Sequence, residues 1–409
     1  MNFIKIAFVV LALSWVNIGY SQSIDSLYKI AADSNREVRA AYEEFNASMQ
    51  RATRLGGMPD PVFSFGYFIN PIETRVGPQR SKIGLSQMFP WFGTLASQEN
   101  SAASMAQAKY HIFLDKQDFL YVKLAESYYP MLEIEEQIRL ENENLKILKS
   151  FKSLAKTSFS NGKSSMVDIL RIDIEIENSQ TNLLLLNELL KPLRIQLNNL
   201  LNWPPDSNYS LNQPFKISMA KLNVVTDTSF SKHPSVVSLL NKLESAEYQE
   251  VAAKKQGAPK IGVGVDYFFI DKSNSINSPD NGRDALMPMV SISIPLYRRK
   301  YKAAIAEAQH YQKAVSYEIE NRKNVLSSKY GLAEYDVTSA IEKHELYDRQ
   351  ISTLQQAIRI TLQEYATSGK DYEELLRLQQ KLLKYKMLRA TQIREYFIAK
   401  TKLNYIISK

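Results

Sequence analysis

The side chains that could carry out catalytic or metal chemistry are scattered along this chain of 409 residues. There is no cysteine, and the four histidines stand far apart, at His111, His233, His310 and His344. The sequence contains no nucleophile elbow, phosphate-binding loop or zinc-binding helix motif. Its many carboxylates fall in heavily charged helical stretches, where they are typical of surface ion pairs. We therefore expect no enzymatic activity, no cofactor and no metal site.

The N-terminal residues indicate export. Lys5 is followed by an almost wholly apolar run from Ile6 to Val16, and the small residues Gly19 and Ser21 come just before Gln22. This pattern predicts a cleavable signal peptide at residues 1–21. The alternative is a retained anchor, although the run is shorter than the roughly 18 to 20 residues that a membrane helix needs. Without cysteine, neither disulfides nor a lipid-bearing cysteine can hold the exported chain.

The charge distribution disfavours nucleic-acid binding. The chain has 51 lysines and arginines against 43 aspartates and glutamates, a formal net charge of +8. The two signs are interleaved along the helical stretches, without a basic cluster or a stacking-aromatic motif. We expect no DNA or RNA partner for an exported protein of this composition.

The sequence contains an internal duplication. A segment beginning at Asn35 matches one beginning at His233, and the order of features is kept from there to the C-terminus. In each copy, a helical stretch leads to two strand-like segments separated by a polar loop, and two long helical stretches follow. Both strand pairs close on proline followed by aromatic residues, at Pro90 and at Pro295. The expected parts are a signal peptide at 1–21, a first repeat at 22–202, a linker at 203–231 and a second repeat at 232–409.

The strand-like segments alternate between two kinds of residue. In the second copy, one face holds Ile261, Val263, Val265, Tyr267 and Phe269, and the other holds Gly262, Gly264 and Asp266. This alternation fits a membrane β-barrel with lipid outside and water inside. It fits equally a soluble antiparallel sheet that packs one face on a core. The strands alone therefore leave both interpretations open.

The helical stretches favour the membrane β-barrel over the soluble sheet. From about Phe92 to Phe159 and from about Arg298 to Tyr365, Pro130 and Gly331 are the only strong helix-breaking signals. At 1.5 Å per residue, each stretch would span about 100 Å, which no compact domain needs. Apolar residues on the returning helices are spaced as in a coiled coil. They are Ile169, Ile172, Ile176, Leu183, Leu186, Leu190, Leu193, Leu197 and Leu200 in the first copy, and Leu375, Leu378, Leu382 and Tyr385 in the second.

A polar glycine turn joins each pair of long helices. The first turn contains Asn161 and Gly162, and the second contains Ser368 and Gly369. Glycine permits the left-handed conformation that ends a helix, and Ser165 or Asp371 can cap the helix that follows. These turns are either ordinary helix-hairpin turns or tips on which a partner docks.

Four strands cannot close a barrel by themselves. In a bilayer, an open sheet edge leaves unsatisfied backbone groups that each cost several kcal/mol, so subunits would have to share one barrel. Two subunits would give eight strands and a filled interior, whereas three would give twelve strands and an open lumen. Since an exported protein with such long helices is more useful as a conduit than as a plug, we expect three subunits.

In the duplication, the strand pair before each long helix, the proline at each strand exit and the glycine tips, the chain resembles the TolC-like outer-membrane efflux family. The resemblance implies a mainly α protein with a membrane β-barrel. Four strands per protomer would form a twelve-stranded trimeric barrel, and the long coiled-coil helices a periplasmic tunnel. Carried over, the strands are about 61–70, 81–90, 259–270 and 287–296. Loops at 70–80 and 271–284 would face outside the cell.

The resemblance also implies a function and partners. The chain would be the exit duct of a tripartite efflux pump in the bacterial outer membrane, exporting small molecules or metal cations from the periplasm. It would form a homotrimer and dock through a periplasmic adaptor, at the turns around Gly162 and Gly369, onto an inner-membrane pump. The alternative is a periplasmic or surface coiled-coil scaffold, whose strand pairs form a small soluble sheet.

The family closes its periplasmic entrance partly with acidic residues beyond the second glycine turn. The corresponding residues are Asp371, Glu373 and Glu374, followed by Arg377 where some relatives carry a second acid; Asp168 and Arg171 occupy matching positions in the first copy. Three copies of an inward carboxylate would form a negative ring that attracts cations. Otherwise Asp371 caps its helix, and the two glutamates form a solvated first turn that the helix dipole favours.

Overall fold

The computed structural model describes residues 23–209, 211, 215–217, 227–275, 277, 279–368 and 372–408. The expected signal peptide, parts of the expected linker, and Gly369 and Asp371 lie outside this range. In chain order the elements are α2 (Ile24–Ser34), α3 (Arg36–Gly56), β1 (Val62–Thr74), β2 (Gly77–Phe89), α4 (Thr94–Ser160), α5 (Met166–Leu201), the short 3-10 helix η1 (Asp227–Lys232), α6 (Pro234–Gln256), β3 (Lys260–Ile270), β4 (Ala285–Ser293), α7 (Arg298–Ser368) and α8 (Tyr372–Ile406). One order, helix, strand, strand, long helix and helix, therefore occurs twice.

The chain divides into two compact units, and each draws on both sequence repeats. The helical unit comprises Met1–Ala40, Leu114–His233 and Asn324–Lys409, and the sheet unit comprises Ala41–Phe113 and Pro234–Lys323. The boundaries of the duplication in sequence are thus different from the boundaries of the units in space.

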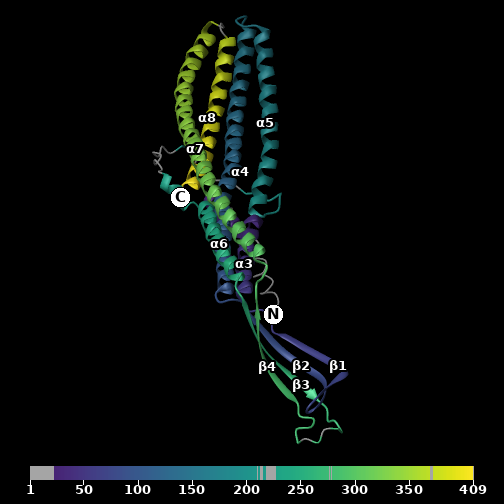
Figure 1. Ribbon diagram of the computed structural model, residues 1–409. Helices are drawn as coiled ribbons and strands as arrows, with labels where there is room; N and C mark the ends of the chain where they lie inside the picture. The colour runs from purple at the N-terminus through teal and green to yellow at the C-terminus, as the bar shows by residue number, and fades with distance from the viewer. Residues whose placement is uncertain are drawn as a thin grey trace, which may run out of the picture. The chain divides into compact units, whose positions relative to one another are not determined.

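The sheet unit contains one antiparallel sheet in the order β1-β2-β3-β4 (Figure 1). The central β2–β3 pair joins the two repeats, with Leu85 opposite Val265. Strands β1 and β4 lie at the two edges, and within the described residues neither has a second neighbour.

The expected loop at residues 70–80 is wrong. Strand β1 continues to Thr74 and β2 begins at Gly77, so only a tight turn separates them. The polar residues of segment 70–80 suggested a loop, yet the two strands pair through this segment. Strand β1 lies at an edge and accommodates Pro71 where its pairing is irregular, because the register shifts between Tyr67 and Ile72. The loop expected at 271–284 does separate β3 from β4.

The turn between β1 and β2 requires glycine. Gly77 has a φ of 129°, and a Cβ there would lie 2.0 Å from the carbonyl oxygen of Asp271. This close approach brings the tight turn of the first repeat against the start of the long loop of the second.

The long helices confirm the sequence expectation. Helix α4 has 67 residues and α7 has 71, and both return through shorter helices, α5 and α8. Pro130 lies inside α4 and Pro192 inside α5 without ending either helix. In the helical unit, contacts join α5 to α4, α4 to α8 and α8 to α7, through Ser179 to Glu141, Gln379 to Asn144 and Arg389 to Asp348. The four helices therefore lie side by side with α5 and α7 at the flanks (Figure 1).

The α5 seam is buried or half-buried as its spacing predicts. Ile169, Ile172 and Leu197 are buried, while Leu184 and Leu185, which lie off the seam, are exposed. At the hairpin end, the seam joins a core of Leu148, Phe151, Ala155, Ile169, Ile172, Tyr365, Tyr372, Leu375 and Leu376. This cluster draws on all four long helices.

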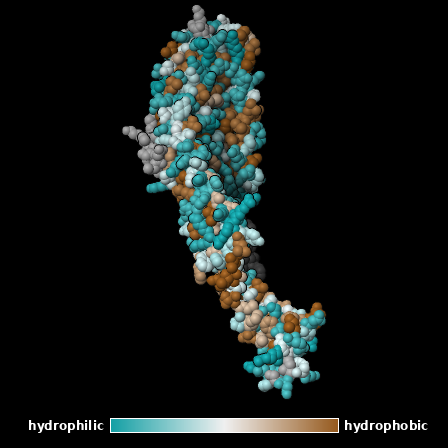
Figure 2. All heavy atoms as spheres, viewed as in Figure 1, coloured by the Kyte–Doolittle hydropathy of each residue, from teal (hydrophilic) through white to brown (hydrophobic). Residues whose placement is uncertain are grey.

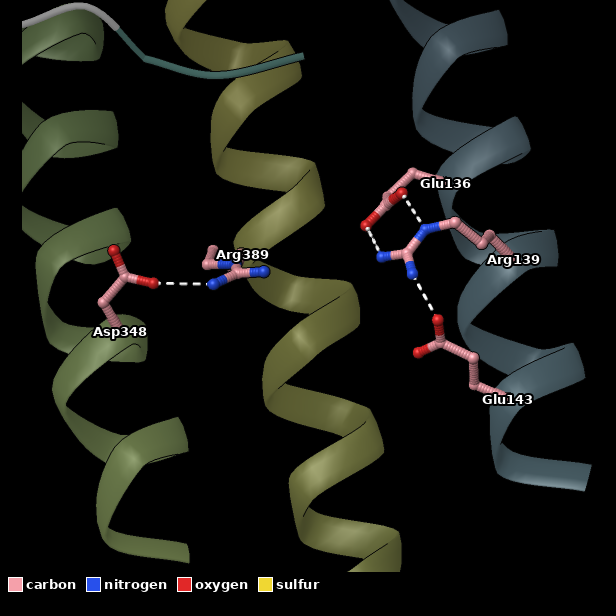
Figure 3. A network of polar contacts seen from close by, with 5 residues as sticks. All are labelled: Glu136, Arg139, Glu143, Asp348 and Arg389. Atoms are coloured by element: carbon pink, nitrogen blue, oxygen red, sulfur yellow. Dashed lines mark hydrogen bonds and ion pairs between the residues drawn. The ribbon is translucent and has the colours of Figure 1, made fainter. Parts of the chain in front are cut away.

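Polar contacts accompany the apolar seam. Arg389 of α8 reaches Asp348 of α7 at 2.8 Å, and on α4 Arg139 lies between Glu136 and Glu143 (Figure 3). Most of these side chains are at least partly exposed, so each pair contributes about 0.2 to 1 kcal/mol. Of these contacts, Arg389–Asp348 joins α8 to α7, whereas the two pairs of Arg139 lie within α4 and support that helix alone.

In the sheet unit, α4 and α6 approach each other through small side chains. The hydroxyl of Ser101 donates to the carbonyl of Ser245 at 2.9 Å, and the hydroxyl of Ser245 donates to the carbonyl of Ser101 at 2.7 Å. Both residues are buried. A larger side chain at this crossing would have to separate the helices.

We predict that Ser245→Leu lowers the unfolding free energy by about 1 to 3 kcal/mol, because it overpacks the crossing. The loss of the buried hydrogen bond that the Ser245 hydroxyl donates adds to this effect. The apparent melting temperature, followed by circular dichroism, would report the change. Glu247→Leu adds the same side chain at an exposed position of α6 and should have little effect. Equal melting temperatures for the two variants would contradict a tight α4–α6 crossing.

Candidate functional site

The first hairpin tip of the helical unit places Asn161, Gly162 and Asp168. Gly162 has a φ of 72°, the left-handed conformation expected from the sequence, and no atom lies within 4 Å of the position of a Cβ there. Ser165 caps α5 by accepting a hydrogen bond from the backbone of Val167 at 3.1 Å. Asp168 accepts a bond from the backbone of Ser165 at 3.1 Å, which completes a capping box. The Asp168 carboxylate therefore stabilises the first turn of α5.

An ion pair links the tips of the two repeats. Arg171 of α5 donates from Nη1 to Oε2 of Glu373 of α8 at 2.7 Å. The two side chains are 43% and 74% exposed, so water and salt screen the pair, and its contribution is about 0.2 to 1 kcal/mol. The pair is therefore a weak connection between α5 and α8.

The negative charge of Glu374 is partly neutralised by Arg377 of the same helix. Its Oε2 accepts two hydrogen bonds from the Arg377 guanidinium, one of them 2.8 Å from Nε. The structure thus brings Glu373 to Arg171 and Glu374 to Arg377. Ser368 ends α7, whereas Asp371 and Gly369 lie outside the described residues.

The tip contains a tyrosine pair that the sequence reasoning did not identify. Tyr365 of α7 and Tyr372 of α8 are buried, with ring centroids 4.9 Å apart. Neither hydroxyl has a hydrogen-bond partner among the described residues. Burial, followed by the nearby Tyr365 and Asp168, raises the pKa of the Tyr372 hydroxyl. The available signal was two tyrosines on either side of the glycine turn.

One face of the sheet is apolar across all four strands. It consists of Phe63, Phe65 and Tyr67 of β1, Ile83 and Leu85 of β2, Ile261, Val263, Val265 and Tyr267 of β3, and Leu286, Val290 and Ile292 of β4, which lie opposite one another in the strand register. Large members are open to solvent in this chain, including Phe63 at 68% and Val290 at 74%. We call this surface the apolar sheet face. On the visible side of the molecule, hydrophobic spheres lie among the strands, and hydrophilic spheres gather at the loop end (Figure 2).

The opposite sheet face is mixed: glycines, serines, Lys82 and Asp266 lie there beside Met88, Phe268, Met287 and Met289. Lys82 of β2 donates to Asp266 of β3 at 3.0 Å, and the Asp266 side chain is only 5% exposed. Gly84 makes this placement possible, because a Cβ on Gly84 would lie 2.2 Å from Oδ1 of Asp266. The alternation expected for β3 is therefore present, and an ion pair between the two repeats lies on its polar face.

Pro90 directly follows the end of β2 at Phe89, and Pro295 follows β4, which ends at Ser293 rather than near 296. Exposed rings come next at both exits, including Phe92 and Tyr297. Proline has no N–H to donate to a strand ladder, so it separates each strand from the helix that follows.

No helix within the described residues is both long enough and apolar enough to cross a membrane. The described residues also contain no group of three or more histidine, aspartate or glutamate side chains arranged to hold a metal ion.

The sequence matches no family model and no curated protein. Solved structures do match the fold along nearly the whole chain. CusC, described as forming a transmembrane channel, aligns with a TM-score of 0.78 at 16% identity over 96% of this chain and 94% of its own. The outer membrane protein VceC from Vibrio cholerae aligns with a TM-score of 0.76 at 13% identity over 94% of this chain and 95% of its own.

The Neisseria gonorrhoeae MtrE outer membrane channel, in its open state, aligns with a TM-score of 0.76 at 15% identity over 94% of this chain and 88% of its own. These similar structures are outer-membrane proteins and channels rather than enzymes. At this level of identity, the likeness establishes the fold. The protomer fold expected from the resemblance to TolC-like proteins is confirmed, and the twelve-stranded trimeric barrel stays a prediction.

We predict that Tyr372→Phe reduces the loss of stability at high pH. Because the folded-state pKa of Tyr372 is raised, its contribution is intact below the ordinary value of about 10 and is lost as pH rises beyond it. At neutral pH the variant should be as stable or slightly more stable, because it removes a buried hydroxyl that lacks a partner. Denaturant unfolding at pH 7 and pH 11 measures both effects. Tyr335→Phe, at an exposed position, is the control, and an unchanged alkaline loss in Tyr372→Phe would refute the assignment.

Proposed function

We propose that this chain is the protomer of a homotrimeric channel in the bacterial outer membrane, the passive exit duct of a tripartite efflux system. The observation that carries the proposal is the apolar sheet face, which spans all four strands; the opposite face is more polar, with glycines, serines and the Lys82–Asp266 pair among its methionines. A soluble protein rarely exposes so many large apolar side chains on one continuous surface. Lipid on one side and water on the other account for both faces.

The strand lengths fit this placement. Strands β1 to β4 have 13, 13, 11 and 9 residues, and a tilted membrane strand needs about 9 to 11. The edge strands β1 and β4 would each leave a row of backbone groups unpaired in a bilayer. Pairing β4 of one protomer with β1 of the next removes every edge, and three protomers give a twelve-stranded barrel with an open lumen.

The flanking helices also support a ring of protomers. Helix α5 exposes Ile174, Leu184 and Leu185, and the part of α7 in the helical unit exposes Leu332 and Ile360. These two helices lie at opposite flanks of the helical unit, so a cyclic arrangement would bring α7 of one protomer against α5 of the next. The same ring would close the barrel and a helical tunnel in the periplasm.

The cargo and the partners that we propose are those expected for the exit duct of a tripartite efflux system. The duct would export small molecules or metal cations delivered by an inner-membrane pump through a periplasmic adaptor. Docking would use the tips around Asn161, Gly162, Ser368 and Gly369. The similar structures are channels, which supports a non-enzymatic role. A periplasmic or surface scaffold would leave the apolar sheet face unexplained.

The gate would be formed at the same tips by Asp168, Arg171, Asp371, Glu373, Glu374 and Arg377. The exposed Arg171–Glu373 pair holds α5 and α8 together at low cost, so it can break when the entrance opens. The carboxylate of Glu374 would add three negative charges to the entrance of a trimer, each partly neutralised by its own Arg377. Cation preference would therefore depend on this local balance.

The proposal predicts that Val263→Arg impairs assembly, because a charge on a lipid-facing strand position near mid-membrane costs about 2 to 4 kcal/mol. The measurement is the protein mass of the detergent-extracted particle by light scattering, with the detergent contribution subtracted. The wild type should be a trimer in the outer-membrane fraction, and the variant should yield less of it.

Ser291→Arg is the matched control, because it adds the same charge to the polar face of neighbouring β4. It should assemble normally. A soluble monomer or dimer for the wild type would overturn the channel proposal, and normal assembly of Val263→Arg would place Val263 away from lipid.

The gate predicts opposite effects for two neighbouring substitutions. In planar bilayers, Glu374→Ala should raise ion leakage or weaken cation preference, whereas Arg377→Ala should strengthen cation preference by uncovering the Glu374 carboxylate. Arg377→Ala together with Glu374→Ala removes one charge of each sign and should return selectivity toward that of the wild type. Glu345→Ala, elsewhere on α7, is the charge control. Unchanged conductance and selectivity in Glu374→Ala would remove Glu374 from the gate.

A further inference from the structure

A cavity in the sheet unit lies where strands give way to helices. Its volume is about 510 Å³, and its lining includes Pro90 and Trp91 after β2, Thr94 at the start of α4 and Tyr301 of α7. Three lysines also line the cavity and give it positive charge: Lys255 from the end of α6, Lys260 from the start of β3 and Lys300 from the start of α7. No carboxylate lines it. We call it the junction cavity.

The three lysines of the junction cavity differ from four other lysines of this unit, which are paired with carboxylates. Among the described residues, Lys82, Lys109, Lys242 and Lys254 each form an ion pair with a carboxylate at 2.7 to 3.0 Å. Within the same range, Lys255 donates only to the backbone oxygen of Gly93, at 3.3 Å, and Lys300 lies over the Tyr301 ring at 4.8 Å. The cavity therefore concentrates positive charge that no protein carboxylate neutralises.

Thr94 provides an independent indication of a ligand. Its side chain is only 4% exposed, and its hydroxyl has no hydrogen-bond partner among the described residues. A buried polar group without a partner costs about 1 to 3 kcal/mol, so its presence needs an explanation. A ligand that accepts a hydrogen bond inside the cavity would provide one.

Thr94 is also the first residue of α4, whose first turn contains no acidic residue. The N-terminus of a helix carries partial positive charge and unpaired backbone N–H groups, which favour anions. The start of α4 thus adds to the positive electrostatic potential that the lysines produce in the cavity.

Gly93 keeps Lys255 in this arrangement. It has a φ of 74°, and a Cβ at this position would lie 2.4 Å from the Lys255 ammonium nitrogen. Any other residue would strain the turn and displace the lysine.

We propose that the junction cavity binds a phosphate group through Lys255, Lys260, Lys300 and the hydroxyl of Thr94. A phosphate offers several acceptor oxygens to ammonium groups that line one cavity, and the cavity volume leaves room for a substituent. The phosphate can belong to a phospholipid headgroup or to a soluble phosphate. Trp91 and Tyr301 in the lining suit the interface between membrane and water. The lipid source rests on the proposed function, because it requires the sheet to lie in a membrane.

The test uses the full-length detergent-purified protein, delipidated and then titrated with phosphatidylglycerol, with bound lipid counted by native mass spectrometry. Lys255→Gln/Lys300→Gln should weaken binding about tenfold or more. The matched control is Arg299→Gln/Lys302→Gln, which removes the same charge from the start of α7 outside the cavity lining. It should change binding less than twofold. Equal losses in the two double variants would overturn the site.

Parallel titrations with inorganic phosphate and with glycerol 1-phosphate identify the source of the phosphate. Variant-sensitive binding of phosphatidylglycerol alone assigns a lipid headgroup, and variant-sensitive binding of the soluble compounds assigns a soluble phosphate. If no probe distinguishes Lys255→Gln/Lys300→Gln from its control, the junction cavity is not a phosphate site. A wild type that does not form a trimer would instead overturn the proposed function.

Thr94→Val tests the hydroxyl separately. It keeps the shape of the side chain and removes the group that lacks a partner, so the melting temperature without ligand should stay equal or rise. Affinity for the bound phosphate probe should fall severalfold. An unchanged affinity would exclude Thr94 from the site.

Discussion

The two unpaired edges of the four-stranded sheet are the constraint on which the rest of the structure depends. Strands β1 and β4 each have one neighbour in the described chain, and the sheet between them exposes apolar side chains. An unpaired strand edge is a liability in water and in lipid, whereas an exposed apolar surface is a liability in water alone. In the proposed assembly, pairing with other copies of the chain would remove the edges. The apolar face would then meet lipid, and the Lys82–Asp266 pair would face the interior.

The duplication is interleaved rather than divided into two domains. Strand β2 of the first repeat pairs with β3 of the second, and α4 of the first contacts α8 of the second. Each compact unit therefore combines parts of both repeats. One repeat alone would supply two strands and one helix hairpin, which are at most marginally stable by themselves. Gene duplication here provides a single assembled protomer rather than two independent ones.

The long helices combine an apolar seam with specific polar contacts. A coiled-coil seam of similar leucines and isoleucines permits several registers, whereas a buried hydrogen-bond pair satisfies only one. Glu141 is 1% exposed and accepts hydrogen bonds from Ser179 and Asn182 of α5, while Gln379 of α8 donates to Asn144 at 3.0 Å. Polar residues along α4 thus align its two neighbours, α5 and α8. At the tips the polar contacts, Arg171–Glu373 and Glu374–Arg377, are more exposed.

The sequence by itself determined the features that arise from local pattern. Alternation in β3, the coiled-coil spacing of α5 and the glycine of the first tip all appear as predicted, because each depends on residues a few positions apart. It also indicated the matching order of the two repeats. The loop expected at 70–80 was wrong because a polar segment does not show whether it will pair: here β1 and β2 continue through it, with an irregular register between Tyr67 and Ile72.

Only the tertiary structure decided which distant residues meet. Arg171 and Glu373 are 202 positions apart, and Lys82 and Asp266 are 184 apart. The Tyr365–Tyr372 pair and the junction cavity likewise became visible only when the elements carrying them were packed. A local pattern specifies which face of a helix or strand is apolar, but not which partner covers it. That choice depends on register and on contacts between both halves of the chain.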